Sequence, residues 1–369
     1  MMRILVITLG VLWQGLSSGA SEERIAVKLG MLQGQASPTQ RLSDYQRGLE
    51  AALFYAIGEN DKRLGQCGYE LEARLAYYDD EDKLSAKERA QALEKEGVWA
   101  IFGPLSSYPF LVARKGLSET AMVSAMAGAR AVTSLPPPFF TMYPAIDELA
   151  NGAVVGVEKG VFGRQYGALI DASCPSCKDF GEEFARQSQG KFERLFWIDV
   201  VGNTPDLLGL MTELAAKPID FLLIPNFSSL SAYVIKQVHE KFPAIKFVGA
   251  DFWGDEQVPN LDKYNLPMSV RGIHVRGGPS ASNMRDYYKV RSLRREHAGK
   301  SVLPDFASFM MVDFIRRLTQ ELCEVKPKDK AAFLAHLRRL KPDHFKTAMK
   351  VAVFTLEGPK VNYAYVVSK

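Results

Sequence analysis

Residues 98–107 read Val-Trp-Ala-Ile-Phe-Gly-Pro-Leu-Ser-Ser, and this stretch decides how the rest of the chain is interpreted. Its apolar part, Val98 to Phe102, has the length of a buried strand, and Gly103-Pro104 marks a turn at its end. The two serines stand where a following helix, expected over residues 108–119, begins. A strand, a tight loop and a helix in succession indicate one unit of an α/β protein.

The same alternation continues on both sides of this stretch. On its amino-terminal side, residues 24–32 and 70–78 have strand patterns, and apolar residues from Leu42 to Ile57 recur at helical spacing. On its carboxyl-terminal side, residues 121–125 form another short apolar run. Strands that alternate with helices predict a parallel sheet with helices on both faces.

A second α/β unit of similar length follows the proline-rich stretch Leu135 to Pro138. From about Gly272 the pattern changes: we expect a long helix over residues 304–323, a basic helix over residues 328–340 and a final pair of strands. The strands of the second unit are expected at residues 165–171, 195–201, 221–225 and 246–250. The predicted fold class is therefore α/β, with two consecutive units.

Length and composition agree with a folded two-domain protein. The chain has 369 residues, and domains usually contain about 100–200. Its 21 Phe, 14 Tyr and 4 Trp provide enough apolar surface for a buried core, whereas disordered chains contain few aromatic residues. The 46 Lys and Arg residues are interspersed with 42 Asp and Glu, which gives a net charge of +4 and no basic block. This pattern gives no support to nucleic-acid binding.

Residues 1–20 are predicted to be a cleaved signal peptide. Arg3 supplies a positive start, Ile4 to Leu12 is a compact apolar run, and Ser18-Gly-Ala20 provides the small residues that a signal peptidase requires. The apolar run is shorter than the ~20 residues of a membrane-spanning helix. We therefore expect a periplasmic or secreted protein, in a compartment where disulfides persist.

Ligands of open α/β sheets bind at the carboxyl ends of strands, so the loops at these ends are candidate sites. Ser106 and Ser107 could hold a carboxylate or phosphate at a helix start, or could simply cap that helix. The small residues of the stretch 126–130 would let a ligand approach the backbone. Asp251 precedes two aromatic residues, which suits a ligand ammonium. Alternatively, Asp251 caps a turn and Trp253 belongs to the core.

Several short motifs occur in a characteristic order along the chain. They are Ile25-Ala-Val-Lys-Leu-Gly30, Tyr45-Gln-Arg-Gly-Leu-Glu-Ala-Ala52, Tyr78-Asp-Asp80, Gly103-Pro-Leu-Ser-Ser107, Phe180-Gly181 and Gly249-Ala-Asp251. In this order and spacing they resemble the type I periplasmic binding proteins, in the branch of the leucine/isoleucine/valine-binding receptors of ABC importers.

This resemblance implies two Rossmann-like lobes joined by a three-segment hinge that closes on a ligand. The hinge crossings would fall near Tyr143, Ile273 and Lys350. The first lobe would contain residues 21–143 and 274–349, and the second lobe residues 144–273 and 350–369.

The resemblance also implies a function. The protein would capture a small ligand, an amino acid or a related compound, in the cleft between the lobes, and would deliver it to the membrane permease of an ABC importer. No enzymatic activity, cofactor, metal ion or nucleic acid is expected, and the protein is expected to be a monomer. A ligand-sensing receptor without transport is an alternative with the same fold.

Carried over residue by residue, the resemblance first assigns a carboxylate site to the first lobe. Ser107 matches the serine that binds the α-carboxylate of the ligand, and Ser106 lies beside it. Ala127 matches the residue whose backbone serves the same carboxylate. Gly128 stands where the family usually has a threonine, so one hydroxyl is absent.

In the second lobe, the resemblance assigns aromatic and acidic contacts. Phe180 matches a position that commonly holds a pocket tyrosine, and Phe227 falls near a second pocket aromatic. Asp251 falls where an acidic residue holds the ligand ammonium, with Trp253 beside it. Each hydrogen bond to a charged group contributes ~1.5–3 kcal/mol, so the hydroxyls absent at Gly128 and Phe180 predict a different affinity or ligand class.

Cys174-Pro-Ser-Cys177 lies between a predicted strand and a predicted helix, as the reactive cysteines of thioredoxin-like proteins do. A thiol–disulfide oxidoreductase is therefore the alternative function. A thioredoxin-like domain of ~100 residues would leave most of the chain unexplained, which favours a local disulfide between Cys174 and Cys177. The sequence does not decide whether Cys67 pairs with Cys323.

Other enzyme and metal motifs are absent from the sequence. It contains no G-x-S-x-G, no G-x-x-x-x-G-K-[ST] and no H-E-x-x-H. The five histidines, at positions 239, 274, 297, 336 and 344, do not have metal-ligand spacing. The acidic run of residues 79–82 lacks the glycine and the spaced ligands of a calcium loop.

Overall fold

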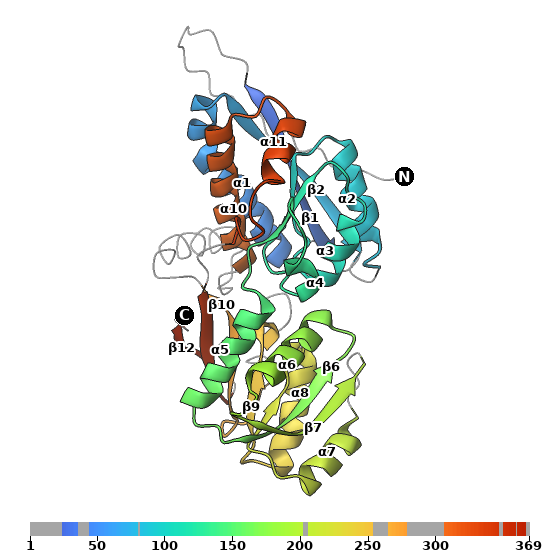
Figure 1. Cartoon of the computed structure of the whole chain (residues 1–369), viewed down its shortest axis with the longest axis vertical. Coiled ribbons are helices and arrows are strands. Elements are labelled where there is room, and N and C mark those ends of the chain that lie inside the picture. The colour runs from blue at the N-terminus through green and yellow to red at the C-terminus, as the bar shows by residue number, and fades with distance from the viewer. Residues whose placement is uncertain are drawn as a thin grey trace.

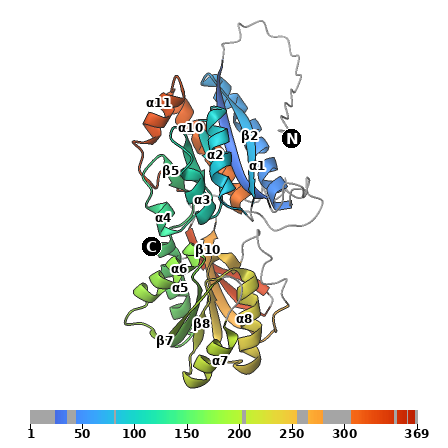
Figure 2. The same ribbon diagram turned by 90° about the vertical axis from the view of Figure 1, so that its right-hand side faces the viewer.

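The computed structural model describes residues 24–35, 44–79, 82–201, 206–253, 265–278, 306–346, 350–358 and 360–366. These residues form two lobes, one above the other, and each lobe is built on its own sheet (Figures 1 and 2). The predicted signal peptide lies outside the described residues. None of the helices in the described part of the chain is long and apolar enough to cross a membrane.

The first lobe contains a parallel five-stranded sheet in the order β2-β1-β3-β4-β5. Its strands are β1 (Ile25–Gln35), β2 (Tyr69–Asp79), β3 (Ala100–Phe102), β4 (Ala121–Ser124) and β5 (Phe139–Thr141). Its helices are α1 (Asp44–Gln66), α2 (Ser85–Lys95), α3 (Ser107–Arg114), α4 (Arg130–Thr133), α10 (Phe306–Val325) and α11 (Lys330–Leu337).

Helices cover both faces of this sheet, as the strand pattern predicts. Successive strand residues point to opposite faces, so Phe102 packs in the core beneath α1 and α10, while Ile101 packs in the core beneath α2 and α3. Helix α3 ends at Arg114, earlier than the helix predicted over residues 108–119. Gly116 follows its end, where the chain passes so close to the Lys87 carbonyl oxygen that a Cβ would lie 2.7 Å from it.

The second lobe contains a seven-stranded sheet in the order β12-β11-β10-β9-β8-β6-β7. Its parallel strands are β6 (Gln165–Asp171), β7 (Glu193–Val200), β8 (Phe221–Leu223), β9 (Lys246–Gly249) and β10 (Arg271–Gly278). The antiparallel strands β11 (Lys350–Glu357) and β12 (Lys360–Val366) complete it and confirm the predicted final strand pair. Its helical segments are α5 (Ile146–Lys159), α6 (Pro175–Gln187), α7 (Leu207–Ala216), α8 (Ser228–Lys241) and the short 3-10 helix η1 (Asp251–Trp253).

The described residues next to the connections between the two lobes lie close together. The chain leaves the first sheet after β5, and the Tyr143 hydroxyl accepts a hydrogen bond from the Gly277 amide at 3.0 Å. Gly278 in turn is paired with Lys350, the first residue of β11. Strand β10 stays in the second sheet as far as Gly278, so the lobe boundary expected between residues 273 and 274 falls inside a strand.

A disulfide ties the first lobe together. Cys67, just after α1, is bonded to Cys323 in α10, with the two Cα atoms 5.2 Å apart. Because α10 returns to the first lobe after the chain has built most of the second, this bond joins segments that lie 256 residues apart in the sequence.

Candidate ligand-binding site

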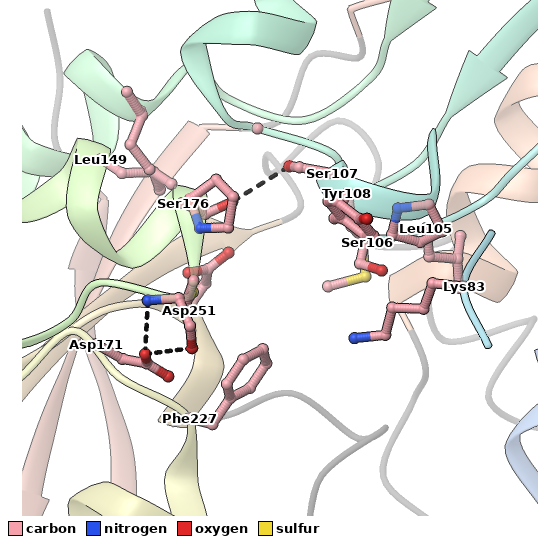
Figure 3. A pocket seen from close by; sticks show the side chains of 17 residues that line it. Lys83, Leu105, Ser106, Ser107, Tyr108, Leu149, Asp171, Ser176, Phe227 and Asp251 are labelled. Carbon is pink, nitrogen blue, oxygen red and sulfur yellow. Dashed lines mark hydrogen bonds between the residues drawn. The ribbon is translucent and has the colours of Figure 1, made fainter. Parts of the chain in front are cut away.

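A cavity of about 340 Å³ lies where the carboxyl ends of strands from both sheets face each other (Figure 3). Its volume falls in the range of small-molecule sites, about 300–1,000 Å³. The first lobe contributes the loops after β2, β3 and β4, and the second lobe the loops after β6, β8 and β9 together with α5. The lining residues are Lys83, Leu105, Ser106, Ser107, Tyr108, Pro109, Met126, Gly128, Ile146, Leu149, Asp171, Ser173, Cys174, Pro175, Ser176, Phe227 and Asp251.

The loop after β3 brings the two serines to the cavity. Gly103 has a φ of +93°, and a Cβ at this position would collide with the Leu32 carbonyl oxygen, so the turn requires glycine. Helix α3 then begins, with Ser106 at its N-cap. The Ser106 side chain makes no capping hydrogen bond, is exposed and lines the cavity.

Ser107 connects three parts of the site. Its hydroxyl accepts a hydrogen bond from the Ala129 amide at 3.2 Å, which fixes the loop after β4. The same oxygen lies 3.2 Å from Ser176 Oγ in the second lobe (Figure 3). Ser107 is buried, so it contributes to the contact between the lobes as well as to the cavity wall.

Ser124, which the sequence analysis did not single out, explains the position of Ala127. The Ser124 hydroxyl donates to the Pro104 carbonyl at 2.7 Å and accepts from the Ala127 amide at 3.1 Å. It thereby joins the loops after β3 and β4. Ala127 is fully buried, its amide is used inside the lobe, and it does not line the cavity. The next residue, Gly128, does line it.

Asp171 and Asn226 shape the second-lobe side of the cavity. The Asp171 carboxylate accepts hydrogen bonds from the amide and the hydroxyl of Ser173, at 2.9 and 2.6 Å. The buried Asn226 side chain accepts from the Asp171 amide at 2.8 Å and donates to the Leu169 carbonyl at 2.9 Å. Asn226 thus joins the ends of β6 and β8, and the residue after it, Phe227, reaches the cavity. Asp171 is the last residue of β6, and Asn226 follows the apolar run of residues 221–225 that contains β8. A polar residue at the carboxyl end of an apolar strand run is the signal by which the sequence could have found them.

Asp251 completes this side of the cavity from the first residue of η1. Two other residues predicted for the site do not line the cavity. Trp253 is fully buried and packs against Gly249 and the His274 ring, so the core alternative is the one that the structure shows. Phe180 is also fully buried in the core. Because α6 begins at Pro175, Phe180 lies in its second turn, beyond the residues that face the cavity.

The Cys174-Pro-Ser-Cys177 segment forms the N-terminal turn of α6. The structure joins the two cysteines by a disulfide, and Cys174 is the N-cap, with its sulfur accepting from the Cys177 amide at 3.2 Å. Cys174, Pro175 and Ser176 line the cavity, whereas Cys177 is fully buried. The sequence motif therefore contributes directly to the cavity wall.

An arginine reaches across the cleft beside the cavity. The Arg130 amide, at the start of α4, donates to the Asp179 carboxylate at 2.9 Å. The Arg130 guanidinium donates to Glu182 and Glu183 of α6, each at 3.2 Å. Hydrogen bonds from Arg186, together with the charge of Arg130, lower the pKa of Glu183 to about 2. Glu183 therefore stays charged at neutral pH, and α6 is held against the first lobe by ion pairs.

Of three comparisons with known proteins, the one with solved structures agrees with this architecture at the level of the fold. No protein-family model and no curated protein matches the chain. A leucine-binding protein, LivK, from Thermotoga maritima has a solved structure that matches 93% of this chain and 99% of its own, with a TM-score of 0.74 and 16% identity. The chain has the fold of the type I periplasmic binding proteins.

Two other solved structures with this fold show how different the ligands of similar proteins are. A solute-binding protein of an ABC transporter from R. palustris is in complex with 4-hydroxybenzoate (TM-score 0.69, 14% identity, 92% of this chain and 96% of that one). A leucine-, isoleucine-, valine-, threonine- and alanine-binding protein from Brucella ovis, in its closed conformation, has a TM-score of 0.70 at 14% identity, over 93% of this chain and 95% of that one. The fold predicted from the resemblance is confirmed, and the identities are too low to transfer a ligand.

Proposed function

We propose that the protein is a solute-binding protein that captures a small ligand between its two lobes. The cavity of about 340 Å³, lined from both lobes at the carboxyl ends of their strands, carries this proposal. A ligand that touches both lobes stabilises the arrangement in which they meet, because it has more contacts there than in any other. The structural similarity to binding proteins of ABC transporters supports the same conclusion.

The proposed ligand is an amino acid or a related small compound. Ser106, Ser107 and the start of α3 provide hydroxyl and amide groups suited to a carboxylate. On the other side of the cavity, Asp251 provides a carboxylate suited to an ammonium group, and Phe227 an apolar surface. We assign ligand contacts to these four residues and to Gly128, and leave Ala127, Phe180 and Trp253 to the core.

The proposed setting is the periplasm, with the permease of an ABC importer as partner. Two disulfides within the described chain suit an oxidising compartment, as does the predicted signal peptide. A sensory receptor with the same fold would bind its ligand in the same cavity. Co-purification of permease subunits with the protein from membranes supports transport, whereas a sensor protein as the recovered partner supports the alternative.

A ligand screen tests the proposal. The purified protein is heated with single amino acids, amides and aromatic carboxylic acids, and the melting temperature Tm is measured. We expect at least one compound to raise Tm, with a stabilisation that grows as RT ln(1 + [L]/Kd), about 2.7 kcal/mol at one hundred times Kd. Asp251→Asn should abolish the shift for a compound that carries an ammonium group.

A second assay checks the enzyme alternative. Nothing in the fold or in the similar structures favours a thiol–disulfide oxidoreductase. We expect no reduction of insulin disulfides above the background of the reductant. Insulin reduction that disappears in Cys174→Ser, together with a screen in which no compound shifts Tm, would replace the binding function by the redox function.

A further inference from the structure

The Cys174–Cys177 disulfide lies in the wall of the cavity, a position that core packing alone does not explain. Four consecutive residues, Ser173 to Ser176, line the cavity. The bond closes residues 174–177 into a covalent ring that contains the first turn of α6. Helix ends ordinarily fray, because their backbone hydrogen bonds are incomplete. At this end of α6, the ring holds the turn in place.

One of the two residues between the bonded cysteines contacts the other lobe. Ser176 lies between the two cysteines, and its hydroxyl is 3.2 Å from the Ser107 hydroxyl (Figure 3). Ser107 in turn accepts from the Ala129 amide at 3.2 Å. A path of hydrogen bonds therefore runs from the disulfide ring in the second lobe to the loop after β4 in the first.

The next turns of α6 extend the same contact. Ser176, Asp179 and Glu183 are spaced three and four residues apart, which places them on one face of the helix. Asp179 and Glu183 both accept hydrogen bonds from Arg130 of the first lobe. Helix α6 is thus docked on the first lobe by one face, and the disulfide fixes the end of this helix that borders the cavity.

We propose that the Cys174–Cys177 disulfide positions Ser176 for its contact with the first lobe. With the bond intact, the ring holds Ser176 against Ser107. Without it, the first turn of α6 samples other conformations, and the contact between the lobes at the cavity forms less often. The oxidation state of this bond thereby changes how often the lobes meet at the Ser107–Ser176 contact. The inference depends on the contact between the lobes and holds whether or not the proposed ligand is found.

Reduction of this bond begins at Cys174, because Cys174 is 7% exposed and Cys177 is fully buried. A thiolate of a dithiol such as dithiothreitol attacks Cys174 Sγ, the S–S bond breaks, and Cys177 leaves as a thiolate. The second thiolate of the reductant then attacks the reductant sulfur that is bonded to Cys174. The reductant closes into a cyclic disulfide, and Cys174 leaves as a thiolate. Two electrons pass from the dithiol to the protein, and the two protons that the dithiol loses balance those that the cysteines gain.

Amide hydrogen exchange measured by mass spectrometry on the full chain tests the proposal. The forms compared are wild type, Cys174→Ser/Cys177→Ser, and Ser176→Ala with the disulfide intact. We expect exchange in the first-lobe peptides covering residues 105–110 and 127–131 to rise about 2- to 10-fold in both variants, the range that loss of one hydrogen bond produces. Ser188→Ala, at the other end of α6, is the matched control and should leave both peptides at the wild-type rate.

A combined variant separates positioning from a general loss of structure. If the disulfide acts through Ser176, adding Ser176→Ala to the double cysteine variant raises exchange in these peptides no further. Faster exchange confined to α6, or effects that add independently, would overturn the proposal. If the double cysteine variant does not fold, wild-type protein is reduced stepwise with dithiothreitol and alkylated, and exchange is compared between molecules with and without the Cys174–Cys177 bond.

Discussion

At the scale of single residues, Arg130 links the two lobes through ion pairs of its side chain. It is the first-lobe partner of two carboxylates on α6, Glu182 and Glu183. Glu183 also pairs with Arg186, which lies on its own helix. One acidic residue therefore contacts an arginine from each lobe, and the two arginines form a matched pair for experiment.

We expect Arg130→Ala to weaken ligand binding by about 2- to 5-fold, the effect of a partly exposed ion pair worth up to ~1 kcal/mol. The radius of gyration in small-angle scattering should increase as the lobes separate more often. Arg186→Ala removes a partner of the same carboxylate within the second lobe and should leave the scattering unchanged. Equal effects of the two variants would show that Arg130 does not act between the lobes.

His274 should make stability depend on pH. It is fully buried between the Trp253 and Phe354 rings, and burial, aided by the charge of Arg276, lowers its pKa to about 3. The unfolded chain takes up this proton near pH 6.5, so the contribution of His274 is complete above that pH and is lost as the pH falls toward 3. Between pH 7 and pH 5, the loss is about 2 kcal/mol, since 1.5 pH units below 6.5 count at ~1.36 kcal/mol each.

Urea unfolding at pH 7 and pH 5 measures this loss. His274→Phe retains an aromatic ring without a titrating group, so the free energy of unfolding of this variant should fall about 2 kcal/mol less than that of the wild type over the same interval. A variant that loses as much stability as the wild type would exclude His274 as the cause.

At the scale of elements, the site depends on how loops at neighbouring strand ends are joined. Ser124 joins the loops after β3 and β4, and Asn226 joins the ends of β6 and β8. These two side chains are buried and lie behind the cavity wall. They hold in register the loops that carry Ser107, Gly128, Asp171 and Phe227 to the cavity.

Asn226→Ala should therefore cost stability and binding together. It leaves the Asp171 amide and the Leu169 carbonyl without their buried partner, at about 1–3 kcal/mol each, so we expect a loss of about 2–6 kcal/mol in the free energy of unfolding. Chemical denaturation measures this loss. Asn226→Asp retains the acceptor for the Asp171 amide but sets a buried carboxylate oxygen against the Leu169 carbonyl, so at neutral pH it should lose at least as much stability as Asn226→Ala. A smaller loss in Asn226→Asp would contradict the donor role of the Asn226 side chain.

The sequence predicts these elements well and their contacts less well. The strand and helix spacings are local properties, so they predict the two α/β units and the final strand pair. The carboxyl ends of parallel strands share one edge of a sheet, and this predicts the cavity position of the loop residues Ser106, Ser107, Phe227 and Asp251. The direction in which Phe180 points depends on where α6 begins. Helix α6 begins at Pro175 with Cys174 as its N-cap, and the apolar spacing does not reveal this start.

At the scale of the whole molecule, the Cys67–Cys323 bond joins segments 256 residues apart. Closing so long a loop restricts the unfolded chain, and such bonds typically contribute about 2–5 kcal/mol. We expect Cys67→Ser/Cys323→Ser to lower the free energy of unfolding by this amount. The ligand affinity should stay within about two-fold of the wild type, because neither cysteine lines the cavity. Parallel thermal-unfolding and ligand-titration measurements on both proteins check this. A changed affinity with unchanged stability would contradict it.

The same bond keeps the protein in one covalent piece after a single cleavage of the backbone between the two cysteines. Helices α2 to α8 and strands β2 to β10 all lie between the two bonded cysteines. A protease that nicks the backbone once in any of the loops between them leaves two fragments that remain one covalent molecule until the bond is reduced. The intact mass would change only by the water added at the cut. In the periplasmic setting proposed for this protein, cleavage of a cavity loop would then leave both lobes covalently joined to each other.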